Sequence, residues 1–162
     1  ALVRQWRHPA ERALLEIPAG TIDPGEDPLT TARRELAEEC GLAAGSWERG
    51  PAFYTAPGFC TERLSLFLAG DLRPTQVVAP EDEELEGSWL TMAEALAAID
   101  AGEIADAKSM AGVRWLDRRL AAGSSRRRIS STNTPVALIT ALACTLNSCP
   151  VSVSRATTPA IF

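Results

Sequence analysis

Residues 20–42 read GTIDPGEDPLTTARRELAEECGL, and the local rules of helix formation explain most of this stretch. Asp27 is a natural N-cap, and Pro28 stands at the first helical position, where its missing N–H costs nothing. Gly41 follows as a C-terminal stop. The stretch therefore predicts a loop rich in Gly and Pro that leads into a helix starting at Pro28.

The predicted helix carries three clustered carboxylates. Glu35 and Glu39 are four residues apart and share one face, and Glu38 is three residues on from Glu35. Carboxylates this close repel one another unless a positive charge lies between them. Oxygen ligands suit a hard divalent cation, Mg²⁺ or Mn²⁺. Taken alone, the residues also allow a second interpretation, a solvated acidic helix face that binds no metal.

The full spacing of the stretch favours the metal. The pattern G-x5-E-x7-R-E-U-x-E-E-x-G-U, with U apolar, resembles the signature of the Nudix hydrolases. It is matched at all nine specified positions, which are Gly20, Glu26, Arg34, Glu35, Leu36, Glu38, Glu39, Gly41 and Leu42. Seven fixed residues would recur by chance in a chain of this length on the order of once in a million. The resemblance implies an α/β (α+β) fold, a mixed β-sheet sandwiched between helices.

The same resemblance implies a reaction and the residues for it. Nudix enzymes split the pyrophosphate of a nucleoside diphosphate linked to another moiety, with metal ions that offset phosphate charge and activate water. The implied metal ligands are Glu35, Glu38, Glu39 and the carbonyl oxygen of Ala19. The residues implied to shape the loop and helix are Gly20, Glu26, Arg34 and Gly41. Glu26 and Arg34 would brace the loop against the helix, and a place for Glu26 in the metal shell is the alternative.

Neighbouring segments narrow the substrate. They resemble ADP-ribose and ADP-sugar pyrophosphatases at Gln5-Trp6-Arg7, at Glu16-Ile17-Pro18-Ala19-Gly20, at Ala56-Pro57-Gly58-Phe59 with Glu62, and in the acidic run 81–86 before Trp89. The resemblance covers roughly residues 1–120 and implies Mg²⁺-dependent hydrolysis of ADP-ribose to AMP and ribose 5-phosphate. The alternatives are a broader specificity for ADP-sugars or dinucleotides, and a nucleotide-binding Nudix domain without turnover.

Five further residues are implied to bind the substrate. Arg7 would contact the diphosphate through its planar guanidinium, the alternative being a surface charge at a strand edge. Glu16 and Glu62 would contact substrate or metal, the alternative being ordinary surface salt bridges. Pro57 and Gly58 would shape the pocket for the terminal ribose, the alternative being a plain turn.

The catalytic base is expected outside the signature, in the acidic run that precedes the last predicted strand. Glu83 is the first candidate and Glu81 the reserve, and each could instead be surface charge. A base must reach the attacking water, which a loop can do on binding substrate. Glu38, on the helix, is the remaining catalytic candidate.

The rest of the chain predicts short elements around this helix. Hydrophobic patterning and turn residues predict strands at 1–7, 13–17, 47–54, 63–70 and 86–90, a loop at 18–27, and further helices at 91–101 and 107–121. Thr91 and Glu94 form the sequence pattern of a capping box at the start of the helix over 91–101.

Charge divides the chain into two parts. Residues 1–123 hold all 21 acidic and 12 basic residues, a formal net charge of −9, whereas residues 124–162 hold four Arg and no acid. We therefore expect a Nudix domain over 1–123 and an atypical Ser/Thr/Arg-rich tail over 124–162. The abrupt change indicates a reading-frame change or an unrelated fusion. The alternative is a genuine tail, disordered at first and then forming a short strand or helix over 136–146.

Composition also restricts the partners and the location. The overall net charge of −5 argues against binding to a nucleic-acid backbone, and no apolar run reaches the length of a membrane span. The four Cys, at 40, 60, 144 and 149, lack the spacing of a zinc site and predict free thiols in the cytoplasm, with a 144–149 disulfide as the alternative.

The resemblance implies a homodimer built through additional N-terminal strands. This chain starts inside a predicted strand, so we do not expect it to dimerise in that way.

Overall fold

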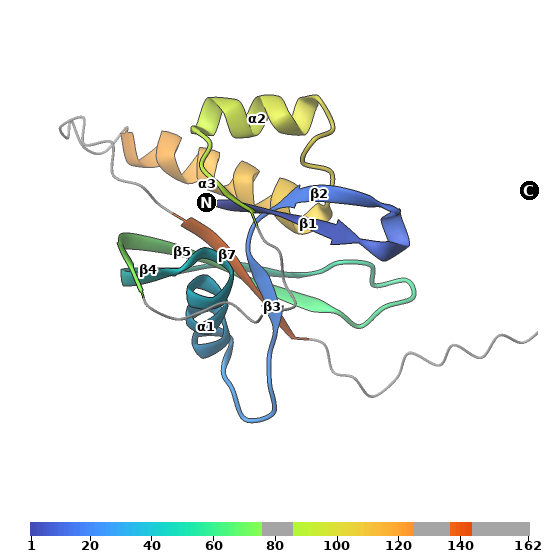
Figure 1. The fold of residues 1–162 in the computed structure, drawn as a ribbon, viewed down its shortest axis with the longest axis horizontal. Helices are drawn as coiled ribbons and strands as arrows, with labels where there is room; N and C mark the ends of the chain where they lie inside the picture. Colours follow the sequence, from blue (N-terminus) through green and yellow to red (C-terminus); the bar gives the residue numbers. More distant parts are fainter. Residues whose placement is uncertain (76–85, 125–136, 144–162) are drawn as a thin grey trace, which may run out of the picture.

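The computed structural model describes residues 1–75, 86–124 and 137–143 (Figure 1). Its helices and strands follow one another along the chain as β1 (Leu2–Arg7), a 3₁₀ turn (His8–Ala10), β2 (Arg12–Glu16), β3 (Ala19–Thr21), α1 (Pro28–Cys40), β4 (Leu42–Tyr54), β5 (Arg63–Pro74), β6 (Glu86–Ser88), α2 (Met92–Asp100), α3 (Ala107–Ser124) and β7 (Ala137–Ala143).

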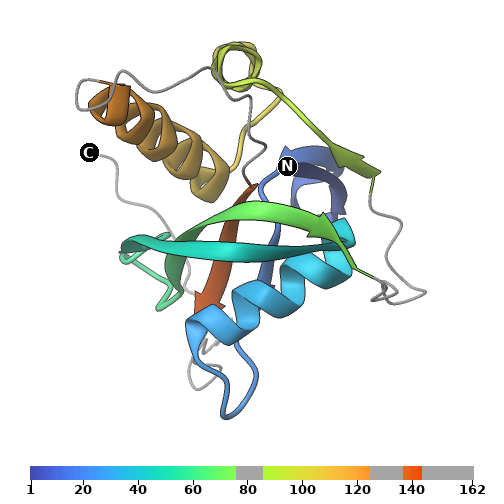
Figure 2. The ribbon, with the colours of Figure 1, turned by 90° about the vertical axis from the view of Figure 1, so that its left-hand side faces the viewer.

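Two sheets form the centre of the fold. The smaller sheet has the antiparallel order β2-β1-β6, in which β1 and β2 form the hairpin that the sequence predicts. The larger sheet has the order β3-β7-β5-β4 and is mixed, because β3 and β7 run parallel whereas the other neighbours are antiparallel. Helix α1 covers one face of the larger sheet, and α2 and α3 lie on the opposite side (Figure 2).

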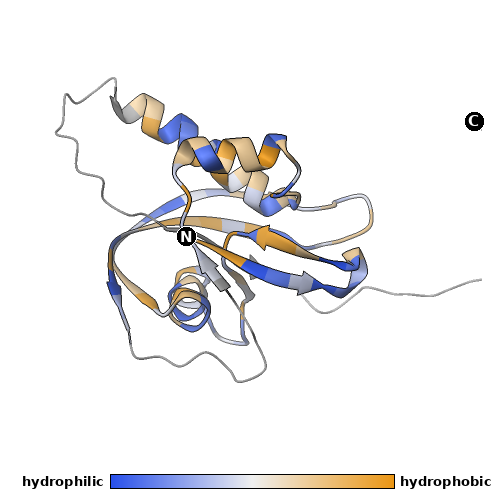
Figure 3. Ribbon diagram, turned by 45° about the horizontal axis from the view of Figure 1, so that its top comes forward, coloured by the Kyte–Doolittle hydropathy of each residue, from blue (hydrophilic) through white to orange (hydrophobic). Residues whose placement is uncertain are grey.

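Strand β5 supports both layers because successive side chains of a strand point to opposite faces. Leu66, which is fully buried, packs in the core that the first two strands share with α2 and α3. Phe67, its neighbour, packs in a second core against Ala32 and Leu36 of α1. Along α2 and α3, apolar residues recur between polar ones (Figure 3). Each helix thus buries an apolar stripe and leaves its polar face in solvent.

The helix ends follow the predicted caps. The Asp27 side chain accepts hydrogen bonds from the backbone N–H groups of Leu29 (2.9 Å) and Thr30 (3.2 Å), and Pro28 is the first residue of α1. Gly41 ends α1 with a φ of 64°, a left-handed conformation that glycine adopts without a steric penalty. The capping box of Thr91 and Glu94 is present at α2.

The larger sheet contains one strand that the sequence does not predict and one that it offers only as an alternative. Residues 19–21, predicted as loop, form β3. Residues 137–143, within the segment where a genuine tail would form a short strand or helix, are β7 between β3 and β5. No local pattern predicts β3, because its partner in the sheet lies more than 100 residues further along the chain. The domain boundary at residue 123 stays a prediction, but one strand from beyond it is part of the sheet.

Two findings concern the cysteines and the helices. Cys40 and Cys60 are free thiols, as predicted, and burial raises the pKa of the Cys40 thiol to about 11. Cys144 and Cys149 lie outside the described residues. Among the helices that the structure describes, none combines the length and the apolar character needed to cross a membrane.

A proline in β7 tests whether the tail strand stabilises the domain. Thr140 lies opposite Ala19 of β3 and Leu66 of β5, so β7 is a central strand whose N–H groups serve its ladders. We expect Thr140→Pro to lower the free energy of unfolding by about 2 kcal/mol or more, since a ladder hydrogen bond is lost and its acceptor is left unpaired. Thr140→Val, which keeps the N–H, is the control. Equal urea midpoints for the proline variant and the unchanged protein would contradict this place for the tail.

Candidate active site

Arg34 of α1 lies among the carboxylates of the loop and helix. Its Nη1 donates to Glu35 Oε1 (2.6 Å) and to Glu38 Oε2 (3.0 Å). Its Nη2 donates to the carbonyl oxygen of Thr21 (3.0 Å) and to Glu26 Oε2 (3.1 Å). Its Nε donates to Glu26 Oε1 (3.2 Å). These contacts join the loop to the helix, as the predicted bracing by Glu26 and Arg34 requires. The hydrogen bonds from Arg34 and Thr31 lower the pKa of Glu26 to about 2.

Strand β3 packs closely against the acidic side chains of α1. The backbone N–H of Ala19 donates to Glu39 Oε2 (3.0 Å), so the residue predicted to offer a carbonyl to the metal lies beside that carboxylate. A Cβ at Gly20 would overlap the carboxylate of Glu35, which is itself only 8% exposed. A side chain at position 20 would therefore displace the Glu35 carboxylate.

The donor atoms gathered here fit a divalent cation in their chemistry. Glu35, Glu38 and Glu39 supply only oxygen ligands, which Mg²⁺ and Mn²⁺ prefer. Among the described residues, no three acidic, His or Cys side chains converge on one point, and Arg34 binds two of these carboxylates. Metal binding at these residues therefore requires Arg34 or the carboxylates to rearrange, and the assignment of ligands stays a proposal.

A second charged network connects β1, β2 and α3. Arg7 donates to both oxygens of Glu16, from Nε (2.8 Å) and Nη2 (2.6 Å), and the Nζ of Lys108 also donates to Glu16 Oε2. Lys108 donates in addition to Asp106 Oδ2 (2.9 Å). Burial opposes ionisation of Glu16, but the hydrogen bonds from Arg7 and Lys108 outweigh it, so the pKa of Glu16 is lowered. Glu16 is 1% exposed and is thus not the surface salt bridge that the sequence left as an alternative.

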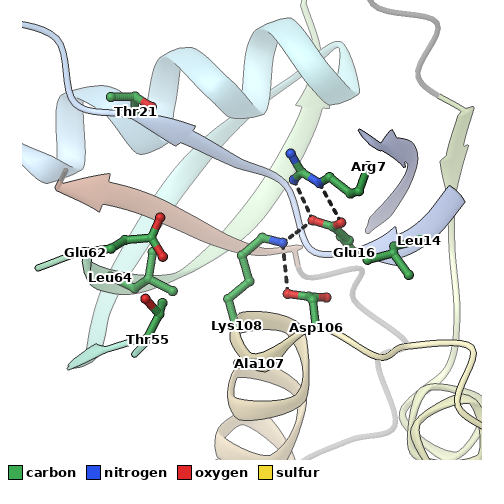
Figure 4. A pocket seen from close by; sticks show the side chains of 10 residues that line it. All are labelled: Arg7, Leu14, Glu16, Thr21, Thr55, Glu62, Leu64, Asp106, Ala107 and Lys108. Atoms are coloured by element: carbon green, nitrogen blue, oxygen red, sulfur yellow. Dashed lines mark hydrogen bonds and ion pairs between the residues drawn. The ribbon is translucent and has the colours of Figure 1, made fainter. Parts of the chain in front are cut away.

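This network forms one wall of a pocket of about 470 Å³. The pocket is lined by Arg7, Leu14, Glu16, Thr21, Thr55, Glu62, Leu64, Asp106, Ala107 and Lys108 (Figure 4). Glu62 lies across the pocket from Arg7, on the β5 side. Three predicted substrate residues that are far apart in the sequence, Arg7, Glu16 and Glu62, are therefore brought to one cavity.

The pocket and the acidic helix are neighbours. Arg7 has a raised pKa, first because of its hydrogen bonds to Glu16, and the charges of Glu39 and Asp106 contribute to the same shift. Thr21 connects the pocket with the acidic helix, because it lines the pocket and its carbonyl oxygen accepts a hydrogen bond from Arg34 of α1. A diphosphate bound at Arg7 would thus lie near the predicted metal ligands.

Other predicted site residues lie elsewhere. Pro57 and Gly58 are in an exposed turn between β4 and β5 and are not among the residues that line the pocket. Their role in binding the terminal ribose stays a prediction. Glu81 and Glu83, the candidates for the base, lie outside the described residues.

The sequence interpretation missed the contribution of α3. Asp106 and Lys108 line the pocket, although residues 107–121 were predicted only as a helix. One signal was available. A lysine in the first turn of a helix faces the positive end of the helix dipole, which is unfavourable unless an acidic partner is near. Such a lysine indicates a partner, but local sequence does not show which one.

Comparison with known proteins places this geometry in a family. The NUDIX domain family matches residues 1–113. The ADP-ribose pyrophosphatase of Bacillus subtilis is 40% identical over 117 residues, which are 71% of this chain and 63% of that protein. The ADP-ribose pyrophosphatase of Mycobacterium tuberculosis is 41% identical over 117 residues, 69% of this chain and 56% of that protein. The methanol dehydrogenase activator of Bacillus methanolicus is 40% identical, with coverage of 71% and 63%.

The chain belongs to the Nudix family. The crystal structure of an ADP compounds hydrolase superposes with a TM-score of 0.65 at 23% identity, over 78% of this chain and 68% of that one, which supports the Nudix fold. The predicted family and fold are thereby confirmed. The chain spans about 60% of the length of the curated relatives it matches.

Gly20 gives a test of the contact between β3 and α1. We expect Gly20→Ala to displace the Glu35 carboxylate and to weaken binding of Mn²⁺, measured by isothermal titration, by about tenfold or more. Gly87→Ala is the control, since a Cβ there meets nothing within 4 Å. Unchanged Mn²⁺ affinity in the Gly20 variant would mean that Glu35 does not ligate the metal.

The Glu26–Arg34 pair predicts a specific dependence on pH. The pKa of Glu26 is about 2 in the folded protein and near its ordinary value of 4.5 in the unfolded chain. Its contribution to stability is therefore full above pH 4.5 and is lost as the pH falls toward 2. We expect Glu26→Gln to lower Tm at pH 7 and the difference from the unchanged protein to shrink between pH 4.5 and 2. A constant difference across this range, measured by thermal unfolding, would contradict the pairing.

Proposed function

We propose that this Nudix domain hydrolyses the pyrophosphate bond of ADP-ribose, giving AMP and ribose 5-phosphate with Mg²⁺, or alternatively Mn²⁺, as cofactor. The observation that carries the proposal is the pocket itself. It is lined by Arg7, whose guanidinium suits a diphosphate, and by Thr21, whose carbonyl oxygen accepts a hydrogen bond from Arg34 of the acidic helix, which suits a metal ion. The identity to ADP-ribose pyrophosphatases over most of this chain supports the same substrate.

Arg7 would bind the diphosphate in this reaction. Its guanidinium is planar, stays protonated and is held by Glu16 at the pocket wall, with its side chain 38% exposed. Such a group binds two phosphate oxygens at once and orients the bridge between them. The substrate would then be held with its scissile bond toward α1.

The acidic residues of α1 would complete the site. Glu35, Glu38 and Glu39, with the carbonyl of Ala19, would hold the divalent ion, which when bound supplies charge neutralisation and a water of lowered pKa. Water then adds across the P–O–P bridge, one phosphorus taking the hydroxyl and the other keeping the bridging oxygen. Glu83, with Glu81 as reserve, is proposed as the base that accepts the proton of that water.

The opposite side of the pocket would receive the sugar. Glu62 and Thr55 line it, and a carboxylate and a hydroxyl are suitable partners for ribose hydroxyl groups. The absence of nucleic-acid and membrane partners stays a prediction. The oligomeric state and the cytoplasmic location stay predictions.

A product assay tests the reaction and its metal ligands together. With ADP-ribose and Mg²⁺ we expect AMP and ribose 5-phosphate in equal amounts. Glu39→Gln should lower kcat/KM by about 100-fold or more, because it removes a charge from the metal site while keeping an acceptor for the Ala19 N–H. Glu48→Gln is a matched control, since Glu48 pairs with Arg119 on the surface.

The outcomes separate the candidates. Comparable rates on ADP-sugars or dinucleotides would favour the broader specificity. Binding of ADP-ribose by folded protein, with no turnover of any nucleoside diphosphate, would favour the non-catalytic domain. Full activity of the Glu39 variant would remove Glu39 from the metal site.

A further inference from the structure

The first turn of α3 attaches this helix to the end of β2. Asp106 stands immediately before α3, and its Oδ2 accepts the backbone N–H of Ser109 (3.1 Å) as a helix cap. The Ser109 hydroxyl accepts the backbone N–H of Ile17 (2.8 Å), and both residues are fully buried. Lys108 lies between Asp106 and Ser109 in the sequence and binds Glu16. The start of α3 is therefore fixed in position against the strand that carries Glu16.

Lys108 occupies an unfavourable place for a cation. It is 8% exposed and lies in the first turn of a helix, where the dipole opposes positive charge. Burying an ammonium is costly unless it is paired and hydrogen-bonded. Glu16 and Asp106 supply that pairing. The lysine stem thus crosses from α3 to β2, as the close view of the pocket shows (Figure 4).

Both oxygens of Glu16 already accept hydrogen bonds from cationic side chains. Its Oε1 accepts Arg7 Nε, and its Oε2 accepts both Arg7 Nη2 and Lys108 Nζ. Arg7, by contrast, uses only Nε and Nη2, and within the part of the chain that the structure describes its Nη1 makes no hydrogen bond. Glu16 is thus a support, and the Nη1 edge of Arg7 is the part of the network that can bind a ligand.

Lys108 also sets the charge of this wall. The two cations Arg7 and Lys108 balance the carboxylates of Glu16 and Asp106, so the four residues are formally neutral. Without Lys108 they would carry one negative charge, and Glu62 across the pocket would add another. The negative charges on the two sides of the pocket would then repel a diphosphate.

We propose that Lys108 is a positioning residue for anion binding, which holds Glu16 so that Arg7 presents its guanidinium to the diphosphate and which offsets the acidic groups around it. The proposal rests on the proposed function, in which Arg7 binds the diphosphate. It assigns to α3 a role in substrate affinity and not in the chemical step.

The test compares variants of Lys108 with the loss of a cation elsewhere on the same helix. Lys108→Met removes the charge and the hydrogen bonds, and Lys108→Gln keeps a donor without the charge. Arg114→Met is the matched control, because Arg114 is an exposed residue of α3 paired with Asp100. Binding of ADP in the presence of Mg²⁺ is measured by calorimetry, and kcat and KM for ADP-ribose by product formation.

We expect Lys108→Met to raise the Kd of ADP and the KM of ADP-ribose about tenfold, with kcat changed by less than about twofold. Lys108→Gln should give a smaller rise, Lys108→Arg should restore most of the affinity, and Arg114→Met should match the unchanged protein. In an Arg7→Met background, Lys108→Met should add little, because residues that act through one another are not additive.

Three results would overturn the proposal: equal ADP affinity in Lys108→Met and Arg114→Met, a fall in kcat with KM unchanged, or additive effects with Arg7→Met. If Lys108→Met does not fold, as judged by thermal unfolding, the Gln and Arg variants carry the same comparison. ADP binding is measured independently of turnover. A protein that binds ADP but hydrolyses no nucleoside diphosphate would therefore refute the proposed function. The ADP affinities of the Lys108 variants would still test the role of Lys108.

Discussion

A single guanidinium, that of Arg34, lies among four carboxylates contributed by the loop before α1 and by α1 itself. It binds Glu26, Glu35 and Glu38 and lies 3.7 Å from Asp23. Carboxylates at this spacing repel one another, and a planar cation with five donors in fixed directions can satisfy several of them at once. The same side chain reaches the carbonyl of Thr21, so it ties β3 to the helix. The acidic site can be assembled before any metal binds because Arg34 is there.

The remainder of the site is organised around a second buried carboxylate. Glu16, at the end of β2, is held by one cation from β1 and one from α3. Removing either partner would leave an incompletely paired charge in the interior, which costs far more than a surface pair is worth. Thr21 connects the two networks, because it lines the pocket and its carbonyl oxygen accepts a hydrogen bond from Arg34. The cluster around Glu16 is formally neutral, whereas four carboxylates surround the single positive charge of Arg34.

How much could be predicted depended on the sequence distance over which each interaction acts. The caps of α1, the bracing pair Glu26–Arg34 and the capping box at Thr91 all join residues within about ten positions, and the sequence predicted each of them. The resemblance to the Nudix signature also implied Gly20, where a side chain would meet the Glu35 carboxylate. By contrast, the contact of Lys108 with Glu16 spans 92 residues, and no local pattern contains it.

The sequence by itself determined the acidic loop–helix segment and the helix ends, because these follow from local hydrogen bonding and from spacing along one helix. The family and the candidate residues on either side of the site followed from the resemblance of several segments to the Nudix hydrolases. Only the tertiary structure decided that Arg7, Glu16 and Glu62 share a cavity with Lys108, and that residues 137–143 complete the sheet between β3 and β5. The physical reason is the same in both cases. Strand pairing and buried ion pairs are chosen by which surfaces pack together, and packing joins residues whose separation in sequence carries no periodic signal.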